Sequence, residues 1–141
     1  MIESTGDPPQ VRLAIREDVD VVVARCRVRE LARAVQMRDT AVEALATAVS
    51  EVVRNIVVHA RAGEVRLSMV RDGPRCGIMV VARDDGPGIS NIELAMQDGY
   101  TTRNSLGLGL SSAQRLVDEF ELVSRTGADA GTTVTLMQWL P

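Results

Sequence analysis

Residues 39–61 read DTAVEALATAVSEVVRNIVVHAR, and their apolar side chains recur at helical spacing. The segment therefore predicts one long amphipathic helix, with Asp39 or Thr40 as its N-cap and Gly63 closing it just beyond Arg61. At about 1.5 Å per residue, such a helix crosses a small domain from side to side. We expect the rest of the fold to pack on its apolar face, formed by Val42, Leu45, Ala46, Val49, Val53 and Ile56.

The polar residues of this helix fall into two sectors. One is an ordinary solvated face made of Glu43, Thr47, Ser50, Arg54 and Arg61. The other contains Ala44, Ala48, Glu51, Asn55 and His59. In the second sector a carboxylate and a carboxamide lie one turn apart beside two alanines, which leaves space for a ligand. On its own this spacing also fits the polar rim of any amphipathic helix, and His59 is expected to cap the helix end rather than bind a metal.

Composition limits the class of protein. The chain has 141 residues, 45% of them hydrophobic, with Trp139, Tyr100 and Phe120 as its only aromatic residues, so one domain with an aliphatic core is expected. The formal net charge is −3 and no basic run offers a track for phosphates, which argues against a nucleic-acid partner. No apolar run approaches the roughly 20 residues of a membrane span. Cys26 and Cys76 are expected to be buried thiols in a reducing cytoplasm, although a single disulfide stays open.

Hydrophobic periodicity predicts the order of the elements. After a flexible leader at 1–10, strands are expected at 11–15, 65–71, 77–83, 121–125 and 132–138, and helices at 18–37, 39–61, 90–97 and 106–120. Strands that follow each other directly do not fit an all-parallel sheet. They predict a two-layer α/β sandwich, in which a mixed or antiparallel β-sheet carries its helices on one face. We expect residues 11–141 to form a single domain.

Two glycine-bearing segments follow the third predicted strand. Asp84–Ile89 (DDGPGI) combines a carboxylate with a rigid, sharply turned loop. Such a carboxylate can accept a hydrogen bond from an exocyclic amine like that of adenine, and Gly86 and Gly88 would let the base lie against bare backbone. Gly107-Leu108-Gly109 precedes a helix, where free N–H groups favour phosphate. Each segment alone also fits an ordinary turn, and the second lacks the third glycine of a dinucleotide-binding fingerprint.

In their order and spacing, these motifs resemble the N, G1 and G2 boxes of the GHKL (Bergerat-fold) ATP-binding superfamily. The matching segments are Glu51-x-x-x-Asn55, Asp84-x-Gly86-x-Gly88 and Gly107-x-Gly109, and Gly131-Thr132 is similar to the segment that completes the adenine pocket. The resemblance covers nearly the whole chain from Val11. Within the superfamily it is greatest to the bacterial anti-sigma-factor serine/threonine kinases of the RsbT type. It implies a mixed sheet with helices on one side.

The resemblance also implies roles for the matched residues. Asn55 would be a ligand of Mg²⁺, Glu51 the general base and Asp84 the residue that reads adenine. The remaining residues would shape the pocket and hold the nucleotide: Gly86, Gly88, Gly107, Leu108, Gly109 and Thr132. Arg103 lies in a loop at 98–105 that has the composition of a mobile lid. It is a candidate for contacting the γ-phosphate, although a solvated arginine is the simpler interpretation.

The function implied by the resemblance is that of an ATP- and Mg²⁺-dependent protein serine/threonine kinase that exchanges partners. Its substrate would be a STAS-type antagonist protein, and its other partner a phosphatase or a sigma factor. Two rivals stay open: a non-catalytic, ATP-dependent binding module (an anti-sigma factor or phosphatase activator), and an ATPase or histidine-kinase-like relay, for which no dimerisation hairpin is evident. Glu51 is the residue that distinguishes a kinase from a non-catalytic binding module, because a binding module needs no general base.

Overall fold

The sheet forms one layer of the computed structural model, which describes residues 10–92, 96 and 110–141. Its five described strands are β1 (Gln10–Ile15), β2 (Gly63–Asp72), β3 (Arg75–Asp84), β4 (Glu119–Arg125) and β5 (Gly131–Trp139). They lie in the order β1-β2-β3-β5-β4, and each neighbouring pair is antiparallel. Of the two expected alternatives, mixed or antiparallel, the described strands therefore form an antiparallel sheet.

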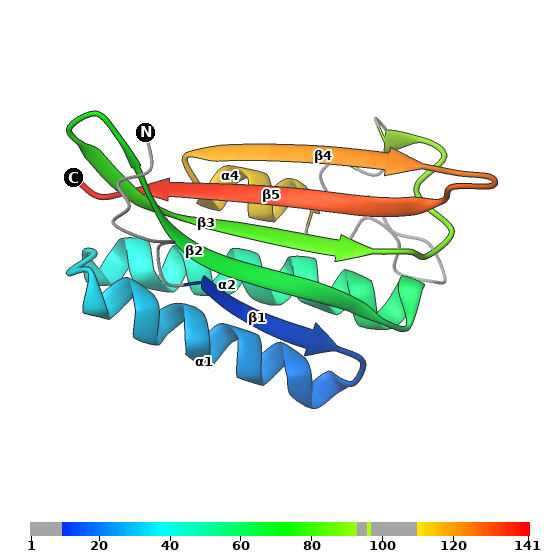
Figure 1. The fold of residues 1–141 in the computed structure, drawn as a ribbon, viewed down its shortest axis with the longest axis horizontal. Helices are drawn as coiled ribbons and strands as arrows, with labels where there is room; N and C mark the ends of the chain where they lie inside the picture. Colours follow the sequence, from blue (N-terminus) through cyan, green and yellow to red (C-terminus); the bar gives the residue numbers. More distant parts are fainter. Residues whose placement is uncertain (1–9, 93–95, 97–109) are drawn as a thin grey trace.

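The helices cover one face of this sheet, as Figure 1 shows. They are α1 (Asp18–Ala34), α2 (Asp39–Asn55), the short π-helix η1 (Ile56–Ala60) and α4 (Leu110–Leu116). The predicted two-layer α/β sandwich is thus confirmed. The N-cap of α2 is Arg38, which precedes both predicted positions, Asp39 and Thr40. None of the helices in the described ranges is long and apolar enough to cross a membrane.

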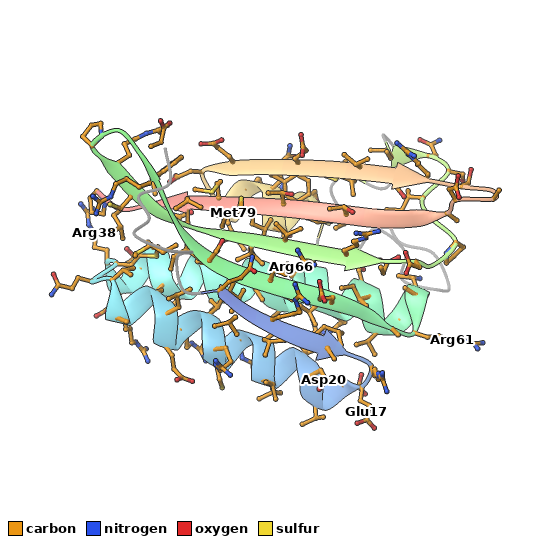
Figure 2. All side chains as sticks on the ribbon, viewed as in Figure 1. Glu17, Asp20, Arg38, Arg61, Arg66 and Met79 are labelled. Atoms are coloured by element: carbon orange, nitrogen blue, oxygen red, sulfur yellow. The ribbon has the colours of Figure 1, made fainter. Side chains whose placement is uncertain are left out.

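The core lies between α2 and the sheet. All six residues of the predicted apolar face of the helix are at most 2% exposed. The strands contribute every second residue to the same core, chiefly Val65, Leu67, Ile78, Val80, Ala82, Val134 and Leu136. Because successive strand residues point to opposite sides, Arg66 and Met79 lie on the face that carries no helix (Figure 2). The aliphatic core predicted from composition is therefore what holds the two layers together.

The end of the long helix differs from the prediction. Arg61, not a glycine, has the positive backbone angle (φ 72°) that reverses the chain, and Gly63 is already the first residue of β2. A side chain at position 63 would meet the carbonyl oxygen of Arg83 at 2.5 Å, so this glycine is needed for strand packing. The last turn, η1, is π-helical rather than α-helical.

Two further predictions were wrong. Phe120 belongs to β4 and not to the last helix, because the chain turns at Asp118. The Asp118 N–H donates to the Gln138 side chain at 3.1 Å, and the Asp118 carboxylate accepts from the Trp139 N–H at 2.8 Å. This pairing starts β4 beside the end of β5. Cys26 and Cys76 are free as expected, but neither is buried: Cys26 is exposed and Cys76 is partly exposed.

Candidate functional site

A row of polar residues ends the apolar, helix-covered face of the sheet. Asp84 of β3 is the register partner of Thr132 of β5, which is in turn the partner of Ser124 of β4. The row one step further into the sheet on the same face is entirely apolar and contains Ala82, Val134 and Leu122. The face therefore changes from apolar to polar within one step, at the end of the molecule where α2 and η1 also end (Figure 1).

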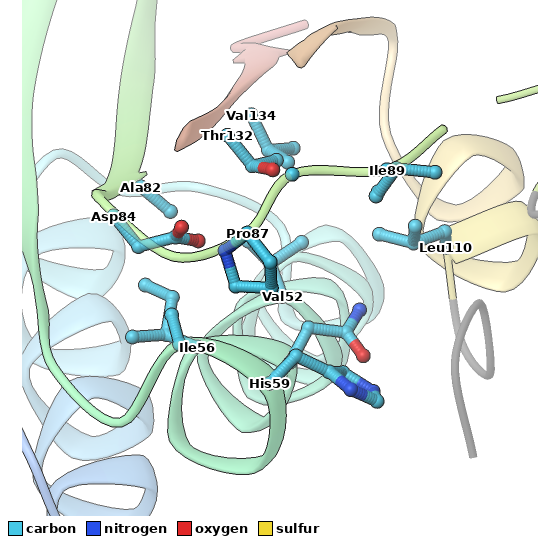
Figure 3. Close-up of a pocket in the computed structure, with 13 residues that line it drawn as sticks. Val52, Ile56, His59, Ala82, Asp84, Pro87, Ile89, Leu110, Thr132 and Val134 are labelled. Atoms are coloured by element: carbon cyan, nitrogen blue, oxygen red, sulfur yellow. The ribbon is translucent and has the colours of Figure 1, made fainter. Parts of the chain in front are cut away.

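A pocket opens between this polar row and the helix end. Its lining consists of Val52, Asn55, Ile56, His59, Ala60, Ala82, Asp84, Pro87, Gly88, Ile89, Leu110, Thr132 and Val134. Figure 3 shows Asp84 and Thr132 on the sheet side, His59 on the helix side and Leu110 at the start of α4. Aliphatic walls with a few convergent polar groups are typical of a small-molecule site.

The Asp84–Ile89 loop is folded tightly against both layers. Asp84 Oδ1 accepts a hydrogen bond from the Gly86 N–H at 2.9 Å. A Cβ at Gly86 would lie 2.7 Å from the Cβ of Ala60, so Gly86 packs the loop on the helix end. Gly88 has a φ of 78°, and a side chain there would collide with the carbonyl oxygen of Arg125. Gly88 lines the pocket, whereas Gly86 serves the packing of the loop.

The environment of Asp84 disfavours the charged form of its carboxyl group. Removal from water is the largest effect and raises the pKa of Asp84 above the ordinary value of 3.8. Hydrogen bonds from the backbone N–H groups of Gly86 and Thr132 oppose this rise, Asp85 adds to it, and His59 opposes it. A half-buried carboxylate at a pocket wall is relieved by a ligand that donates a hydrogen bond to it, and such groups cluster at functional sites.

The helix side of the pocket carries two polar side chains, each with one buried nitrogen that has no partner among the described residues. Asn55 Nδ2 and His59 Nε2 are both buried, and neither has a hydrogen-bond partner in the structure as described. Buried polar atoms are nearly always paired, so these two indicate groups arranged for a ligand. The π-helical turn follows Asn55 and contains His59, and such turns occur frequently at functional sites. His59, which was predicted to cap the helix, lies in its last turn and also lines the pocket.

Not every predicted site residue reaches this pocket. Asn55, Asp84, Gly88 and Thr132 line it together, but Glu51 does not. The Glu51 side chain is 29% exposed, and its Oε1 lies 3.4 Å from Nη1 of Arg54. The other predicted site residues lie outside the described residues, namely Arg103, Gly107, Leu108 and Gly109.

Sequence reasoning missed the apolar walls and Ser124. The wall residues Val52, Ile56 and Val134 have the spacing of core residues, and nothing in the sequence separates a pocket wall from a core. Ser124 did leave a signal, because it follows Phe120 and Leu122 at the inward parity of β4, where an apolar residue is expected. Its meeting with Thr132 depends on strand register, which the sequence pattern did not specify.

Comparisons with known proteins agree with this geometry. Residues 13–139 match the model of the histidine kinase-like ATPase domain. The chain is 36% identical over 126 residues to serine/threonine-protein kinase RsbT of Bacillus subtilis, covering 89% of this chain and 93% of the relative. It is 34% identical over 100 residues to an anti-sigma F factor of a Thermoanaerobacter species, covering 67% of each.

The comparison of structures gives the same fold. The RsbU and RsbW domains of a Mycobacterium tuberculosis protein, solved together as a crystal structure, superpose with a TM-score of 0.65 at 22% identity. The match covers 94% of this chain and 33% of the mycobacterial one, so the present chain corresponds to about a third of that protein.

Proposed function

This chain belongs to the histidine kinase-like ATPase family, and on that premise we propose that it is an ATP-dependent protein serine/threonine kinase. One observation carries the proposal: Asn55, Asp84 and Thr132, which come from three distant parts of the sequence, line one pocket. The motif resemblance predicts that Asn55 binds the metal ion and that Asp84 and Thr132 belong to the adenine pocket. In this proposal residues 11–141 act as a single kinase domain.

The sheet side of the pocket would bind the base. Asp84 accepts a hydrogen bond from the exocyclic amine of adenine, which gives its half-buried carboxylate the partner that water no longer provides. The base lies among aliphatic side chains that line the same pocket, including Ile56, Ala82 and Val134. Guanine carries a carbonyl oxygen at the position of the amine, so this wall favours ATP over GTP.

The helix side would hold the phosphate end. Asn55 is suited to be a ligand of Mg²⁺, because its amide oxygen is a donor that this ion accepts. Its buried amide nitrogen has no partner among the described residues, so the side chain is not held by other contacts of that nitrogen. Bound Mg²⁺ would neutralise charge on the phosphates. Leu110 lines the pocket at the start of α4. We therefore assign the residues before it, Gly107-Leu108-Gly109, to the phosphates, and Arg103 to the γ-phosphate.

Glu51 is the proposed general base. It lies one helical turn before Asn55, and it would take the proton of a serine or threonine hydroxyl as that oxygen bonds to the γ-phosphorus and ADP leaves. Its present partner, Arg54, is exposed and 3.4 Å away. Such surface ion pairs contribute little, so an approaching substrate can displace this one.

We place the accepting hydroxyl on a STAS-type antagonist protein, and we take a phosphatase or a sigma factor as the partner that is exchanged for it, in the cytoplasm. A relative named as an anti-sigma F factor supports this partner class. One observation favours the second candidate, a non-catalytic ATP-dependent binding module: Glu51 lies outside the pocket lining. The two candidates differ in whether phosphate leaves ATP for a partner.

Intact mass spectrometry distinguishes them. The protein is incubated with Mg-ATP and the antagonist protein encoded nearby, and the masses of both are measured. A gain of one phosphate on the antagonist supports the kinase. Unchanged masses at stoichiometric enzyme contradict the kinase and favour the binding module. Asp84→Asn is the matched control, because it weakens ATP binding and should therefore slow a transfer that depends on this pocket.

A further inference from the structure

The hydroxyl of Ser124 connects two parts of the pocket wall without lining the pocket itself. Its Oγ accepts a hydrogen bond from the Ile89 N–H at 2.7 Å. The same atom lies 2.7 Å from Oγ1 of Thr132 and 3.2 Å from the carbonyl oxygen of Gly131. Ile89 and Thr132 both line the pocket, but Ser124 does not. One half-buried hydroxyl therefore ties the Asp84–Ile89 loop to the start of β5.

The number of protons on this hydroxyl restricts what its neighbours can do. A serine hydroxyl has one proton to donate and two lone pairs that accept. The Ile89 N–H occupies one lone pair, so the proton goes either to the Gly131 carbonyl or to Thr132. If it goes to Gly131, Thr132 must donate to Ser124 and presents only an acceptor to the pocket. If it goes to Thr132, the proton of Thr132 is free to donate to a ligand.

The second arrangement matches adenine. Asp84, as a carboxylate, can only accept, and Thr132 is its register neighbour on the same face of the sheet. A donating Thr132 beside an accepting Asp84 gives the pocket one acceptor next to one donor. Adenine presents the complementary pair, an amine that donates next to a ring nitrogen that accepts. Guanine lacks that amine and has a carbonyl oxygen in its place.

We propose that Ser124 is a positioning residue that determines base specificity: it donates to Thr132, so that Thr132 can donate to a ring nitrogen of adenine. Ser124 acts only through Thr132 and Ile89 and has no contact with the nucleotide of its own. The inference rests on the proposed function, since it requires a purine nucleotide in this pocket.

Calorimetric titration with Mg-ATP and Mg-GTP tests the proposal on variants of the full chain. Ser124→Ala should weaken ATP binding about 5- to 20-fold, because Thr132 loses the partner that orients its hydroxyl toward the base, and should change GTP binding little. The ratio of the two affinities therefore falls. Ser124→Thr keeps the hydroxyl and should retain the wild-type ratio, whereas Ser124→Cys, a weak donor, should behave like alanine.

Two further variants separate this role from general support of the fold. Thr133→Val removes a hydroxyl from the neighbouring residue of β5, which points to the other side of the sheet, and should leave both affinities unchanged. In a Thr132→Val background, Ser124→Ala should weaken ATP binding less than it does in the wild type, because the residue it acts through is missing. A purely structural serine would weaken binding equally in both backgrounds.

The outcomes distinguish the inference from the proposed function. If the wild type binds ATP, but Ser124→Ala leaves the ATP-to-GTP ratio unchanged, the inference is wrong and the proposed function stands. Should Ser124→Ala fail to fold, equal ratios for Ser124→Cys and Ser124→Thr contradict the inference in the same way. If the folded wild type binds neither nucleotide, the proposed function is itself wrong, and the inference falls with it.

Discussion

The two ends of the helix formed by α2 and η1 follow different rules, and Figure 2 shows them marked by Arg38 and Arg61. In α2 up to Ser50, the predicted apolar face is fully buried. The Ser50 hydroxyl, predicted to be solvated, is buried as well, and it donates to the Ala46 carbonyl oxygen at 2.9 Å. At the other end the last turn is π-helical and Arg61 has a φ of 72°. Two buried nitrogens there, Asn55 Nδ2 and His59 Nε2, have no partner within the part of the chain that the structure describes.

Within this one helix, the first end therefore contributes mainly to the stability of the fold and the second end mainly to ligand binding. Unpaired buried polar atoms and positive backbone angles cost free energy, and a fold retains them where the surrounding structure fixes them in place. The well-packed part of the helix stabilises the fold and so offsets the free-energy cost of the irregular last turn. Changes at the first end should therefore alter unfolding, and changes at the second should alter ligand binding.

The largest expected effect is the contrast between one substitution at each end of the helix, measured by the free energy of unfolding and by the affinity for Mg-ATP. Leu45→Ala removes a side chain that is 0% exposed and should lower the free energy of unfolding by about 2–5 kcal/mol, while the molecules that stay folded keep their affinity for Mg-ATP. Asn55→Ala should weaken Mg-ATP binding and change the free energy of unfolding little, because it removes a buried group whose nitrogen has no partner among the described residues. Denaturant unfolding and calorimetry measure the two properties. The comparison breaks if Asn55→Ala destabilises the protein as much as Leu45→Ala does.

The next effect concerns catalysis at the boundary between the two ends. Glu51→Gln keeps the shape of the side chain, so nucleotide binding should persist, while loss of the general base should slow transfer by about 10²–10³-fold. Phosphoryl transfer depends largely on positioning and charge, which keeps the loss below the upper limit for such bases. The rate of antagonist phosphorylation measures it. A wild-type rate would remove Glu51 from the mechanism and favour the binding module.

The regular half of the molecule is also the half that the sequence predicts well. Val42, Leu45 and Val49 have a clean helical period, and all three are fully buried, as that period predicts. Alternation in the strands likewise predicts the sheet. Phe120 misled the prediction because its spacing from Leu116 suits a helix, whereas the side-chain hydrogen bonds of Asp118 end that helix early.

The site was less predictable because its geometry arises from contacts across the fold. Through a family resemblance, the N and G1 motifs locate Asn55 and Asp84, and the Gly131-Thr132 segment locates Thr132. They do not reveal that η1 is π-helical or that Arg61 makes the turn expected near Gly63. Ser124 depends on strand register, and His59 on the burial of its ring nitrogen. The hydrophobic periodicity of a single segment cannot predict these contacts, because they form between segments that are distant in the sequence.

The smallest expected effect is the pH dependence of stability at the strained end. Because the pKa of Asp84 is raised on folding, this group contributes stability that is fully present below the ordinary pKa of 3.8 and is lost as pH rises through the raised value. At neutral pH Asp84→Asn should therefore be slightly more stable than the wild type without nucleotide, and the difference should vanish in acid. Thermal unfolding of both proteins across pH checks this. A variant that is less stable at every pH would mean that the carboxylate supports the fold.

Affinity for ATP and GTP, measured by calorimetry on the wild type and on Asp84→Asn, tests the central claim most directly. The claim is that the irregular end of the helix and the polar row of the sheet together bind an adenine nucleotide. The account predicts that the wild type prefers ATP and that Asp84→Asn weakens ATP binding by about 1–3 kcal/mol. Asp85→Asn, at an exposed position outside the pocket lining, serves as the control and should bind like the wild type. Equal affinities for ATP and GTP in the wild type, or undiminished ATP binding by Asp84→Asn, would contradict it.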